Sequence, residues 1–414
     1  MNLTLAPHKL GGTVAAPASK SQAHRFLICG AFCNKPVKII CPEISGDIDA
    51  TVRCLRALGA GISRCGDVYT VRPAEQTPEG AVLDCGESGS TLRFLLPVVG
   101  ALGISADFLL RGSLRSRPIL PLLRVMEKKG ISFSVPEEGR LHMEGRLRGG
   151  NFEIAGNISS QFISGLLMAL PLTGRDSNIM LTSPLVSASY VELTLEALRQ
   201  FGIHAEAIPG GWHLGGGRFC APCCSLQVEG DWTNAALWLC IGAVSSPVTV
   251  TGLRPESRQG DRKILSLLRA FGAEVSEEAD RITVSPAPLQ GIDIDASDIP
   301  DLVPVLSLLG TCARGTTRIS GAGHLRYKES DRLSAIAQTL NSLGGSVHIT
   351  SDGLSIDGAA LHGGTADSFG DHRIAMLTAA AASVSDGPIL LTGAEAVSKS
   401  YPRFWEDYKK LVIL

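Results

Sequence analysis

Acidic and basic side chains that could hold an anion and move a proton gather in two short stretches of the sequence. Asp301 ends the tripeptide IPD. The stretch YKESDRL carries Lys328, Glu329 and Arg332. Paired carboxylates among cations can transfer a proton to or from a bound molecule. A structural interpretation is equally open at this point, in which Asp301 caps a helix and Glu329 pairs with Arg332.

A second candidate for anion binding is the stretch LDCGESGSTLRFLL, residues 83–96. Small and hydroxyl residues separate an apolar run from an apolar helical pattern, so a strand is expected to turn into a helix here. The backbone N–H groups at such a helix start are free to bind an anion. Ser-Gly-Ser is also an ordinary helix cap, and the isolated stretch favours that simpler explanation.

Comparable polar groups precede five more apolar helical patterns. These groups are Lys20-Ser21, Ser159-Ser160-Gln161, Asp231–Asn234, Asp298–Asp301 and Gly370–Arg373. Capping explains Ser, Thr and Asp at such positions, but it does not explain cations, which are unfavourable near a helix N-terminus unless an anion lies with them. The cations in question are Lys20, Arg25, Arg93 and Arg373. Six such helix starts facing a common space would attract a polyanion of modest size.

The elements that must position these groups include five helical patterns with a charged face, each ending in a glycine. The glycines are Gly59, Gly130, Gly202, Gly272 and Gly344, at intervals of 70 to 72 residues. Glycine is expected directly after a helix because the chain turns there through positive φ. The even spacing predicts a repeated structural unit, and the tail PRFWEDYKKLVIL predicts a sixth, unfinished copy.

A second series of helical patterns alternates with the first and is apolar on most of its surface. Its members include SQAHRFLICGA, STLRFLLPVVGA, TNAALWLCIGA and HRIAMLTAAAA. Such helices are expected to be buried, and short β-like runs such as VTVTGL and PILLTG lie between the two series. The pattern predicts six α/β units of about 70 residues, arranged either as one symmetric object or as two three-unit lobes.

The bulk composition argues against several classes of function. A net charge of −2 gives no support for nucleic acid or an anionic membrane as a partner. The N-terminus MNLTLAPHKL does not resemble a signal peptide, and apolar runs such as 302–313 are too short to span a bilayer. Eleven cysteines without framework spacing are typical of free thiols in a reducing cytoplasm. The cluster Cys220-x-x-Cys223-Cys224 lacks a second ligand pair, so no metal site is expected.

Taken together, the motifs resemble the enolpyruvyl transferases, and within that family the members that act on shikimate 3-phosphate. The resemblance covers essentially the whole chain. It is carried by Lys20-Ser21 with Arg25, LDCGESGSTLRF, Arg117-Pro118, SSQF at 159–162, Ser187 with Tyr190, EGD at 229–231, IPD at 299–301, KESDRL at 328–333, DHR at 371–373 and Lys399. So many motifs in order make an accidental similarity improbable.

The resemblance implies an α/β fold of two lobes, each built from three βαβαββ units in an inverse α/β barrel-like arrangement. One lobe is expected to combine residues 1–18 and 228–414 and to contain both termini. Residues 19–227 are expected to form the inserted second lobe. The active site is expected in the cleft between the lobes, which close on the first substrate and exclude water.

The resemblance also implies roles for individual residues. Those expected to bind shikimate 3-phosphate are Lys20, Ser21, Arg25, Ser159, Ser160, Gln161, Ser187, Tyr190, Asp301 and Lys328. Those expected to bind phosphoenolpyruvate are Lys20, Gly89, Arg117, Gln161, Glu329, Arg332, Arg373 and Lys399. Proton transfer is expected from Lys20, Asp301 and Glu329, whose division of labour the sequence leaves open.

The implied reaction transfers the enolpyruvyl group of phosphoenolpyruvate to the 5-hydroxyl of shikimate 3-phosphate through a tetrahedral intermediate. It belongs to the shikimate pathway of aromatic amino acid biosynthesis. No metal or organic cofactor is expected, because phosphoenolpyruvate supplies the leaving group. The partners are small molecules, and we expect a cytoplasmic monomer. Gly89 resembles the glycine of herbicide-sensitive members, so glyphosate is expected to compete with phosphoenolpyruvate.

Two alternatives stay open. A transferase acting on UDP-N-acetylglucosamine typically carries a reactive cysteine in the loop before its Arg-Pro, and residues 111–117 contain none. The other alternative is a non-catalytic protein that binds phosphorylated ligands. Three positions depart from the family's pattern: His324 and Glu87 each replace a frequent Asn, and Ser189 replaces a frequent Pro. These departures put contact details in doubt rather than the reaction.

Overall fold

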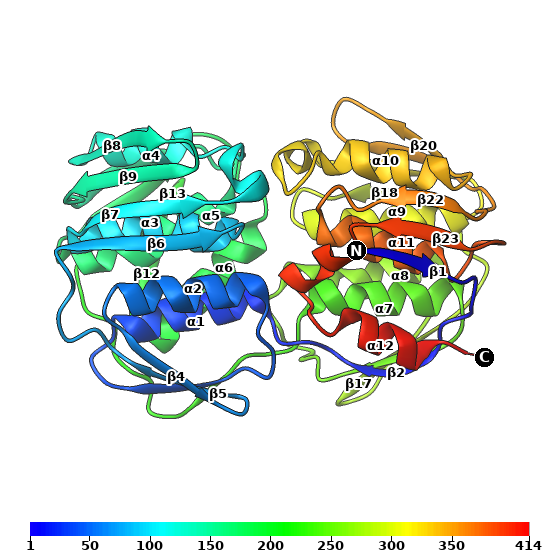
Figure 1. Cartoon of the computed structure of the whole chain (residues 1–414), viewed down its shortest axis with the longest axis horizontal. Coiled ribbons are helices and arrows are strands. Elements are labelled where there is room, and N and C mark those ends of the chain that lie inside the picture. Colours follow the sequence, from blue (N-terminus) through cyan, green and yellow to red (C-terminus); the bar gives the residue numbers. More distant parts are fainter. Residues whose placement is uncertain (414) are drawn as a thin grey trace. The chain divides into compact units, whose positions relative to one another are not determined.

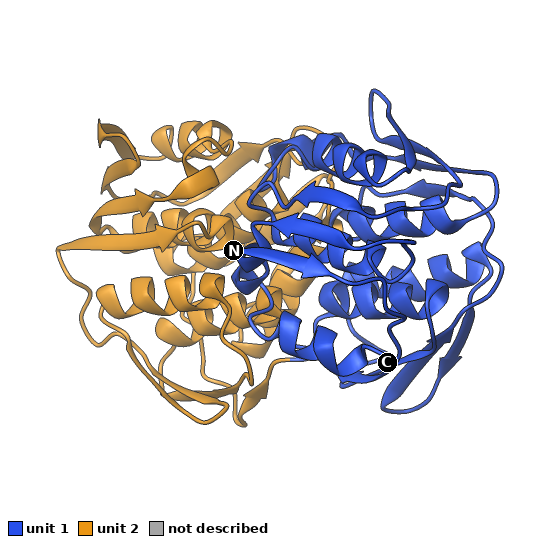
Figure 2. Ribbon diagram, turned by 45° about the vertical axis from the view of Figure 1, so that its right-hand side comes forward, with its two compact units in different colours: residues 1–17, 229–414 blue, residues 18–228 orange. Residues whose placement is uncertain are grey.

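The computed structural model describes residues 1–413, so Leu414, the last residue of the expected C-terminal lobe, lies outside the described residues. The chain divides into two compact units (Figure 2). Unit 1 comprises Met1–Pro17 and Glu229–Leu414, and unit 2 comprises Ala18–Val228. Each unit has a hydrophobic core of its own.

Unit 2 contains three four-stranded sheets, one for each of its three repeats (Figure 1). In every sheet the first strand runs parallel to the second, and the second pairs antiparallel with a hairpin. In order across each sheet, the strands are β14 (Leu226–Gln227), β3 (Val37–Ile40), β5 (Val68–Arg72) and β4 (Gly61–Cys65); β6 (Gly80–Gly86), β7 (Ser105–Leu110), β9 (Arg140–Gly145) and β8 (Ile131–Glu137); and β10 (Gly150–Ile154), β11 (Ser177–Leu181), β13 (Gly211–Leu214) and β12 (Ala205–Ile208).

Unit 1 repeats this arrangement, except that the N-terminal strand completes its last sheet. The sheets are β2 (Gly12–Ala15), β15 (Val248–Thr251), β17 (Arg281–Ser285) and β16 (Glu274–Glu277); β18 (Asp293–Asp295), β19 (Thr316–Ser320), β21 (Leu354–Asp357) and β20 (Ser346–Ile349); and the three-stranded β22 (Gly364–Asp367), β23 (Ile389–Thr392) and β1 (Asn2–Leu5). Strand β1 pairs antiparallel with β23, where the other sheets have a hairpin strand.

Each repeat has one buried helix, and a more polar helix follows it along the chain. The buried helices are α1 (Lys20–Ala31), α3 (Gly89–Leu102), α5 (Ser160–Ala169), α7 (Trp232–Val244), α9 (Val303–Cys312) and α11 (His372–Ala381). The more polar helices are α2 (Gly46–Ala57), α4 (Leu120–Glu127), α6 (Ala188–Gln200), α8 (Ile264–Phe271), α10 (Arg332–Ser342) and α12 (Phe404–Leu411). Short 3-10 turns are η1 (Gly112–Arg115), η2 (Leu170–Thr173), η3 (Gly260–Lys263), η4 (Pro300–Leu302), η5 (Gly323–Tyr327) and η6 (Ala394–Lys399).

The five repeat glycines end their helices as the spacing predicts. All five have positive φ, between 75° and 100°. A side chain is unfavourable in this region of backbone space, which glycine enters freely. At Gly130 a Cβ would also lie 3.0 Å from the backbone oxygen of Arg146, so this turn has little room for one. The helix expected in the tail is α12.

Two strands are exchanged where the chain passes between the units. Strand β2 leads into α1 of unit 2 but pairs with β15 of unit 1, Gly12 opposite Val248. Strand β14 leads toward α7 of unit 1 but pairs with β3 of unit 2. Each unit therefore contains the strand that precedes the first helix of the other.

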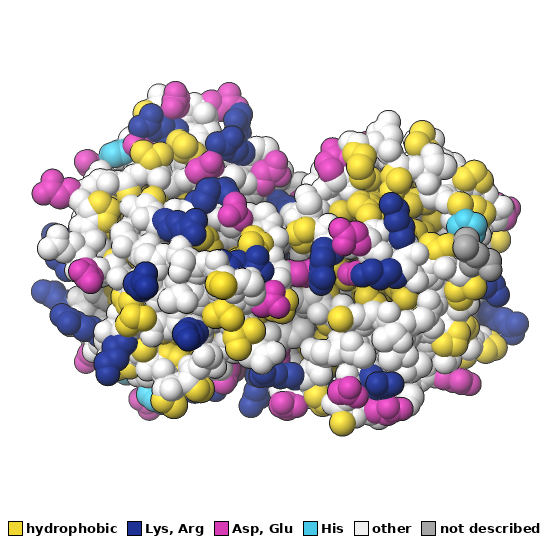
Figure 3. Space-filling model, turned by 60° about the horizontal axis from the view of Figure 1, so that its bottom comes forward, with side chains coloured by type: hydrophobic (Ala, Val, Ile, Leu, Met, Phe, Trp, Pro, Cys, Tyr) yellow, Lys and Arg dark blue, Asp and Glu magenta, His cyan; other side chains and the backbone are white. Residues whose placement is uncertain are grey.

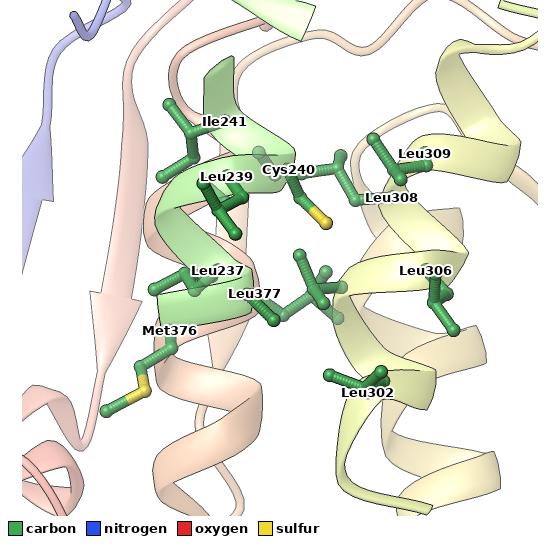
Figure 4. Packing of buried hydrophobic residues seen from close by; sticks show 14 of the residues in the cluster. Leu237, Leu239, Cys240, Ile241, Leu302, Leu306, Leu308, Leu309, Met376 and Leu377 are labelled. Carbon is green, nitrogen blue, oxygen red and sulfur yellow. The ribbon is translucent and has the colours of Figure 1, made fainter. Parts of the chain in front are cut away.

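The core of unit 1 lies between its buried helices α7, α9 and α11. Cys240, Leu308 and Leu377, one from each helix, are fully buried and extend into the space between the helices (Figure 4). Burial of one Leu side chain stabilises a fold by about 1.5–3 kcal/mol. Packing on all sides explains why these helices have no polar face.

The face shown in Figure 3 intermixes basic and acidic side chains on both units. This pattern fits the net charge of −2 and gives neither unit a field of one sign on that face. Among the described residues no helix is long and apolar enough to cross a membrane.

The α/β fold of six repeats confirms the fold class predicted from the sequence. Three repeats belong to each unit, so of the two arrangements left open by the spacing, the pair of three-unit lobes is right. The apolar series forms the buried helices, and runs such as VTVTGL and PILLTG form strands β15 and β23.

We expect Gly130→Ala to lower the free energy of unfolding by about 1–2 kcal/mol, because alanine must adopt positive φ beside the Arg146 oxygen. Urea denaturation followed by circular dichroism measures the change. Gly80→Ala is the matched control in the same repeat, since its φ is ordinary and the nearest atom to its Cβ lies at 3.7 Å. Equal effects of the two substitutions would contradict the explanation.

Candidate active site

Three buried helices of unit 2 begin at serine caps, and their first turns carry several of the expected site residues. Ser19, Ser88 and Ser159 each accept a hydrogen bond from a first-turn backbone N–H of α1, α3 or α5, at 3.2 to 3.4 Å. The side chains that follow the caps are Lys20, Ser21, Ser90, Ser160 and Gln161. The capping interpretation is therefore right for these serines, and the caps border the candidate ligand groups.

A carboxylate compensates the ammonium group of Lys20 at the start of α1. Its Nζ lies 2.8 Å from Oδ2 of Asp47, in the first turn of α2, and both side chains are largely buried. A lone cation at a helix N-terminus is unfavourable, and Asp47 both compensates the charge of Lys20 and holds its side chain in place. Sequence reasoning missed Asp47, because no motif joins it to a residue 27 positions earlier.

The guanidinium of Arg25 ties three helices of unit 2 together. Its donors reach Oγ1 of Thr194 (2.8 Å), the backbone oxygens of Ser21 (2.6 Å) and Tyr190 (2.7 Å), and Oγ of Ser164 (3.3 Å). Burial lowers the pKa of Arg25 to about 10, so it stays charged at neutral pH. A guanidinium has five N–H groups, which leaves one on Nη1 for a ligand.

A glutamine joins the starts of α3 and α5. The side-chain oxygen of Gln161 accepts a hydrogen bond from Nη1 of Arg93 at 2.7 Å, and its amide nitrogen donates to Oγ of Ser90 at 3.0 Å. Nη2 of Arg93 donates to the backbone oxygen of Pro118 at 2.9 Å. Arg93 thus orients a candidate ligand side chain. From the sequence alone, this positioning residue could be recognised only as an unexplained cation.

The first residue of α3 has no room for a side chain because a guanidinium lies against it. A Cβ on Gly89 would lie 2.6 Å from Nη1 and 3.0 Å from Cζ of Arg117. Arg117 reaches this place from the loop between η1 and α4. The structure therefore brings together two of the residues expected at phosphoenolpyruvate.

Ser187 has an unusual backbone conformation at the start of α6. It is one of two non-glycine residues with positive φ in the described part of the chain, at 55°; the other, Phe369, precedes α11. Such strained positions are often found at functional sites. Tyr190 lies one turn later, and its backbone oxygen accepts the Arg25 bond described above. This contact links three residues expected at shikimate 3-phosphate, namely Ser21, Arg25 and Tyr190.

Arg332, the first residue of α10, is the centre of the charged cluster in unit 1. Its side chain is buried and reaches three carboxylates from three segments. Nε lies 2.8 Å from Oδ2 of Asp371, Nη1 lies 2.6 Å from Oδ1 of Asp301, and Nη2 lies 2.8 Å from Oε2 of Glu329. One buried cation therefore joins η4, the segment before α10, and the cap of α11.

Further cations surround these acids. Nζ of Lys328 lies 3.9 Å from Oδ1 of Asp301, and Nζ of Lys399 lies 3.7 Å from Oε1 of Glu329. Arg373, in the first turn of α11, donates from Nη1 to Oδ1 of Asn234 at 2.9 Å. The structure thus gathers all the site residues expected in this unit: Asp301, Lys328, Glu329, Arg332, Arg373 and Lys399.

The carboxyl group of Asp301 is set to accept a hydrogen bond rather than to donate one. Burial alone would raise the pKa of Asp301, but the charges of Lys328, Arg332 and Arg373 hold it well below its usual range. Asp301 is therefore ionised at neutral pH. An ionised carboxylate among cations suits an anionic ligand that also carries a hydroxyl group.

Of the three departures from the family's pattern, His324 lies among these charged groups. Burial, followed by the charge of Lys328, lowers the pKa of His324 to about 4, so the imidazole is neutral at neutral pH. Its Nε2 is buried and has no hydrogen-bond partner within residues 1–413. A neutral imidazole can donate or accept one hydrogen bond, as the amide of Asn can.

The structural interpretation of the two acids is half right. Asp301 lies in η4 and caps no helix, since α9 begins at Val303 without a side-chain cap. Glu329 does pair with Arg332, but from the segment before α10. Asp371 was not predicted as a partner of Arg332, because its Asp-His-Arg motif is also an ordinary helix start.

Comparisons with known proteins find relatives over the whole chain. A family model described as EPSP synthase (3-phosphoshikimate 1-carboxyvinyltransferase) matches residues 5–408. A protein named 3-phosphoshikimate 1-carboxyvinyltransferase from Clostridium kluyveri is 39% identical over 413 residues, covering 99% of this chain and 97% of the relative. Its namesake from Clostridium acetobutylicum is 40% identical over 414 residues, covering 98% and 96%.

Solved structures share the fold. An EPSP synthase from Acinetobacter baumannii superposes with a TM-score of 0.82, covering 99% of this chain and 98% of the other at 24% identity. The enolpyruvyl transferase NikO from Streptomyces tendae gives 0.79, covering 99% and 97% at 23% identity. At these identities the likeness is evidence for the fold alone.

We expect Arg332→Met to lower the free energy of unfolding by about 3–5 kcal/mol at pH 7, because it leaves buried carboxylates without their cation. In the wild type, the lowered pKa of Asp301 contributes stability at pH values above the pKa that this group has in the unfolded state. This stability is lost only in strong acid. In Arg332→Met the carboxylates are easier to protonate. The difference in free energy of unfolding between the variant and the wild type should therefore become smaller as the pH falls toward 4.5.

Urea denaturation at both pH values measures this effect. Arg318→Met is the control, because it removes a cation whose side chain is exposed. Its Nη1 lies 3.7 Å from Oδ1 of Asp293, which is also exposed. If the free energy of unfolding of Arg332→Met falls below that of the wild type by the same amount at both pH values, the charge-based explanation is contradicted.

Proposed function

The chain belongs to the EPSP synthase (3-phosphoshikimate 1-carboxyvinyltransferase) family, and we propose that it transfers the enolpyruvyl group of phosphoenolpyruvate to the 5-hydroxyl of shikimate 3-phosphate. The products are 5-enolpyruvylshikimate 3-phosphate and phosphate. The observation that carries the proposal is the cluster around Arg332, where an ionised carboxylate and several cations meet. The reaction serves the shikimate pathway of aromatic amino acid biosynthesis.

The residues of both units are needed for one reaction, because each unit carries only part of the set. In unit 2 the hydroxyl groups and the remaining N–H of Arg25 suit the phosphate and carboxylate of shikimate 3-phosphate. Gly89 and Arg117 suit phosphoenolpyruvate, because the missing side chain lets the guanidinium lie against the start of α3, where both can meet a small anion. The remaining ligand groups of unit 2 are Lys20, Ser21, Ser159, Ser160, Gln161, Ser187 and Tyr190.

Unit 1 supplies two of the three candidate groups for proton transfer, Asp301 and Glu329, and unit 2 supplies the third, Lys20. Ionised Asp301 accepts the hydrogen bond of the 5-hydroxyl and takes its proton as this oxygen attacks the vinyl carbon. Glu329 and Lys20 are the candidates that protonate the methylene group and later remove that proton as phosphate leaves. Lys328 binds shikimate 3-phosphate with Asp301, while Arg332, Arg373 and Lys399 offset the charge of phosphoenolpyruvate.

The enzyme acts on small molecules, and we propose that it works as a monomer in the cytoplasm. All eleven cysteines are free within the described residues. Free thiols in this number are typical of a reducing compartment.

The proposal is tested by phosphate release from shikimate 3-phosphate plus phosphoenolpyruvate. We expect release that requires both substrates and stops when UDP-N-acetylglucosamine replaces shikimate 3-phosphate. Binding of both ligands without release would favour a non-catalytic binding protein. Phosphate release from phosphoenolpyruvate with UDP-N-acetylglucosamine, but not with shikimate 3-phosphate, would favour the other transferase.

In the same assay Lys20→Ala and Arg373→Ala should each lower activity by more than about tenfold, the scale of one charge-assisted contact. The matched controls are Lys38→Ala and Arg318→Ala, which remove exposed cations from the same units. Wild-type turnover in either site variant would show that the site is misplaced.

Gly89→Ala should raise the KM for phosphoenolpyruvate by about tenfold, because the new Cβ displaces the guanidinium of Arg117. Steady-state kinetics with each substrate varied in turn measures this, and the KM for shikimate 3-phosphate should change little. For the wild type we expect glyphosate to compete with phosphoenolpyruvate. An inhibition constant far above the KM for phosphoenolpyruvate would contradict that expectation.

A further inference from the structure

Asp261 is a buried carboxyl group in unit 1 that none of the proposed steps uses. It lies in η3, and Oγ1 of Thr233 in α7 is hydrogen-bonded to its Oδ2. Its Oδ1 is also buried and has no hydrogen-bond partner within residues 1–413. A buried ionised carboxylate normally needs several hydrogen bonds or a cation in contact, so this environment suits the neutral acid.

Of the charged groups that face Asp261, the two acids oppose its ionisation and the cation favours it. Asp231, the cap of α7, and Asp301 of η4 add negative charge nearby, and the cation that faces it is Arg373 of α11. Arg373 directs Nη1 to Asn234. The basic neighbours on its own element, Arg262 and Lys263, have exposed side chains. Burial, followed by the charge of Asp301, raises the pKa of Asp261 to about 7.

We propose that Asp261 holds a proton while unit 1 binds its anionic ligand at Arg373, and that loss of this proton weakens the binding. The inference rests on the proposed function, which assigns Arg373 to phosphoenolpyruvate. Asp261 is a positioning residue, because it acts on the ligand through Arg373. Neutral Asp261 leaves the guanidinium charge available to the ligand, whereas ionised Asp261 competes for that charge.

Kinetics against pH provide the first test, with wild type, Asp261→Asn and Asp280→Asn compared between pH 6 and 8.5. Asn mimics the protonated acid, and Asp280 is an exposed carboxylate in the same unit. In the wild type and in Asp280→Asn, the KM for phosphoenolpyruvate should rise by about tenfold over this range, the scale of one pKa unit of interaction. The rise should be absent in Asp261→Asn, with kcat little changed. All three proteins share the ionisations of the substrate, so the difference between profiles reports on Asp261.

Thermal unfolding against pH tests the same proton without any turnover. A pKa raised in the folded state contributes stability that is present at low pH and lost as pH rises through about 7. The melting temperature of Asp261→Asn, relative to that of the wild type, should therefore increase as pH rises from 6 to 8.5. Asp280→Asn should follow the wild type.

Should Asp261→Asn fail to fold, carbon-13 NMR of aspartate-labelled wild type follows the carboxyl directly, with assignment through Thr233→Ser. A buried aspartate that titrates near neutrality supports the proposal, and a carboxyl that ionises below pH 5 overturns it. Parallel KM profiles in wild type and Asp261→Asn overturn it as well. Absence of phosphate release by a wild type whose Asp261 still titrates near neutrality refutes the proposed function instead.

Discussion

A guanidinium buried among carboxylates is stable only when each charge is compensated, and Arg332 meets this condition with acids from three segments. Asp371 is at once a partner of Arg332 and the cap of α11, so the ion pair fixes where that helix begins. Asp301 is held ionised by the same surroundings. The position of Asp301, the start of a buried helix and the start of α10 thus depend on one cation.

The repeats share one frame but carry different side chains at their helix starts. Each repeat contains one buried helix and one more polar helix. In unit 2 the starts of the buried helices carry mostly hydroxyl and amide groups, and Arg25 and Arg93 donate hydrogen bonds to groups of the same unit. In unit 1 the cluster around Arg332 joins three acids with one buried cation. Substitution at equivalent positions of a repeat therefore gives the two units different chemical groups on the same frame.

The sequence was most informative where a local rule governs structure. A glycine after each of the first five more polar helices has a local cause, the need for positive φ, so Gly59 to Gly344 revealed the repeat without any knowledge of packing. Candidate site residues could be proposed by type, through cations at helix starts and through the family's motifs. Their partners could not. Asp47, Asn234 and Asp371 bond to residues 27 to 139 positions away, and such contacts depend on how the helices pack. The burial that sets the protonation of Asp261 is likewise a property of the assembled core.

The discontinuity of unit 1 also imposes an order on folding during synthesis. Unit 2 is continuous in sequence, and every strand of its sheets is synthesised before α7. Strands β1 and β2 are made first, yet their partners β23 and β15 lie far along the chain. Two nascent edge strands must therefore stay unpaired while a whole unit folds behind them. Their shortness, four residues each, limits the exposed backbone that a neighbouring chain could capture.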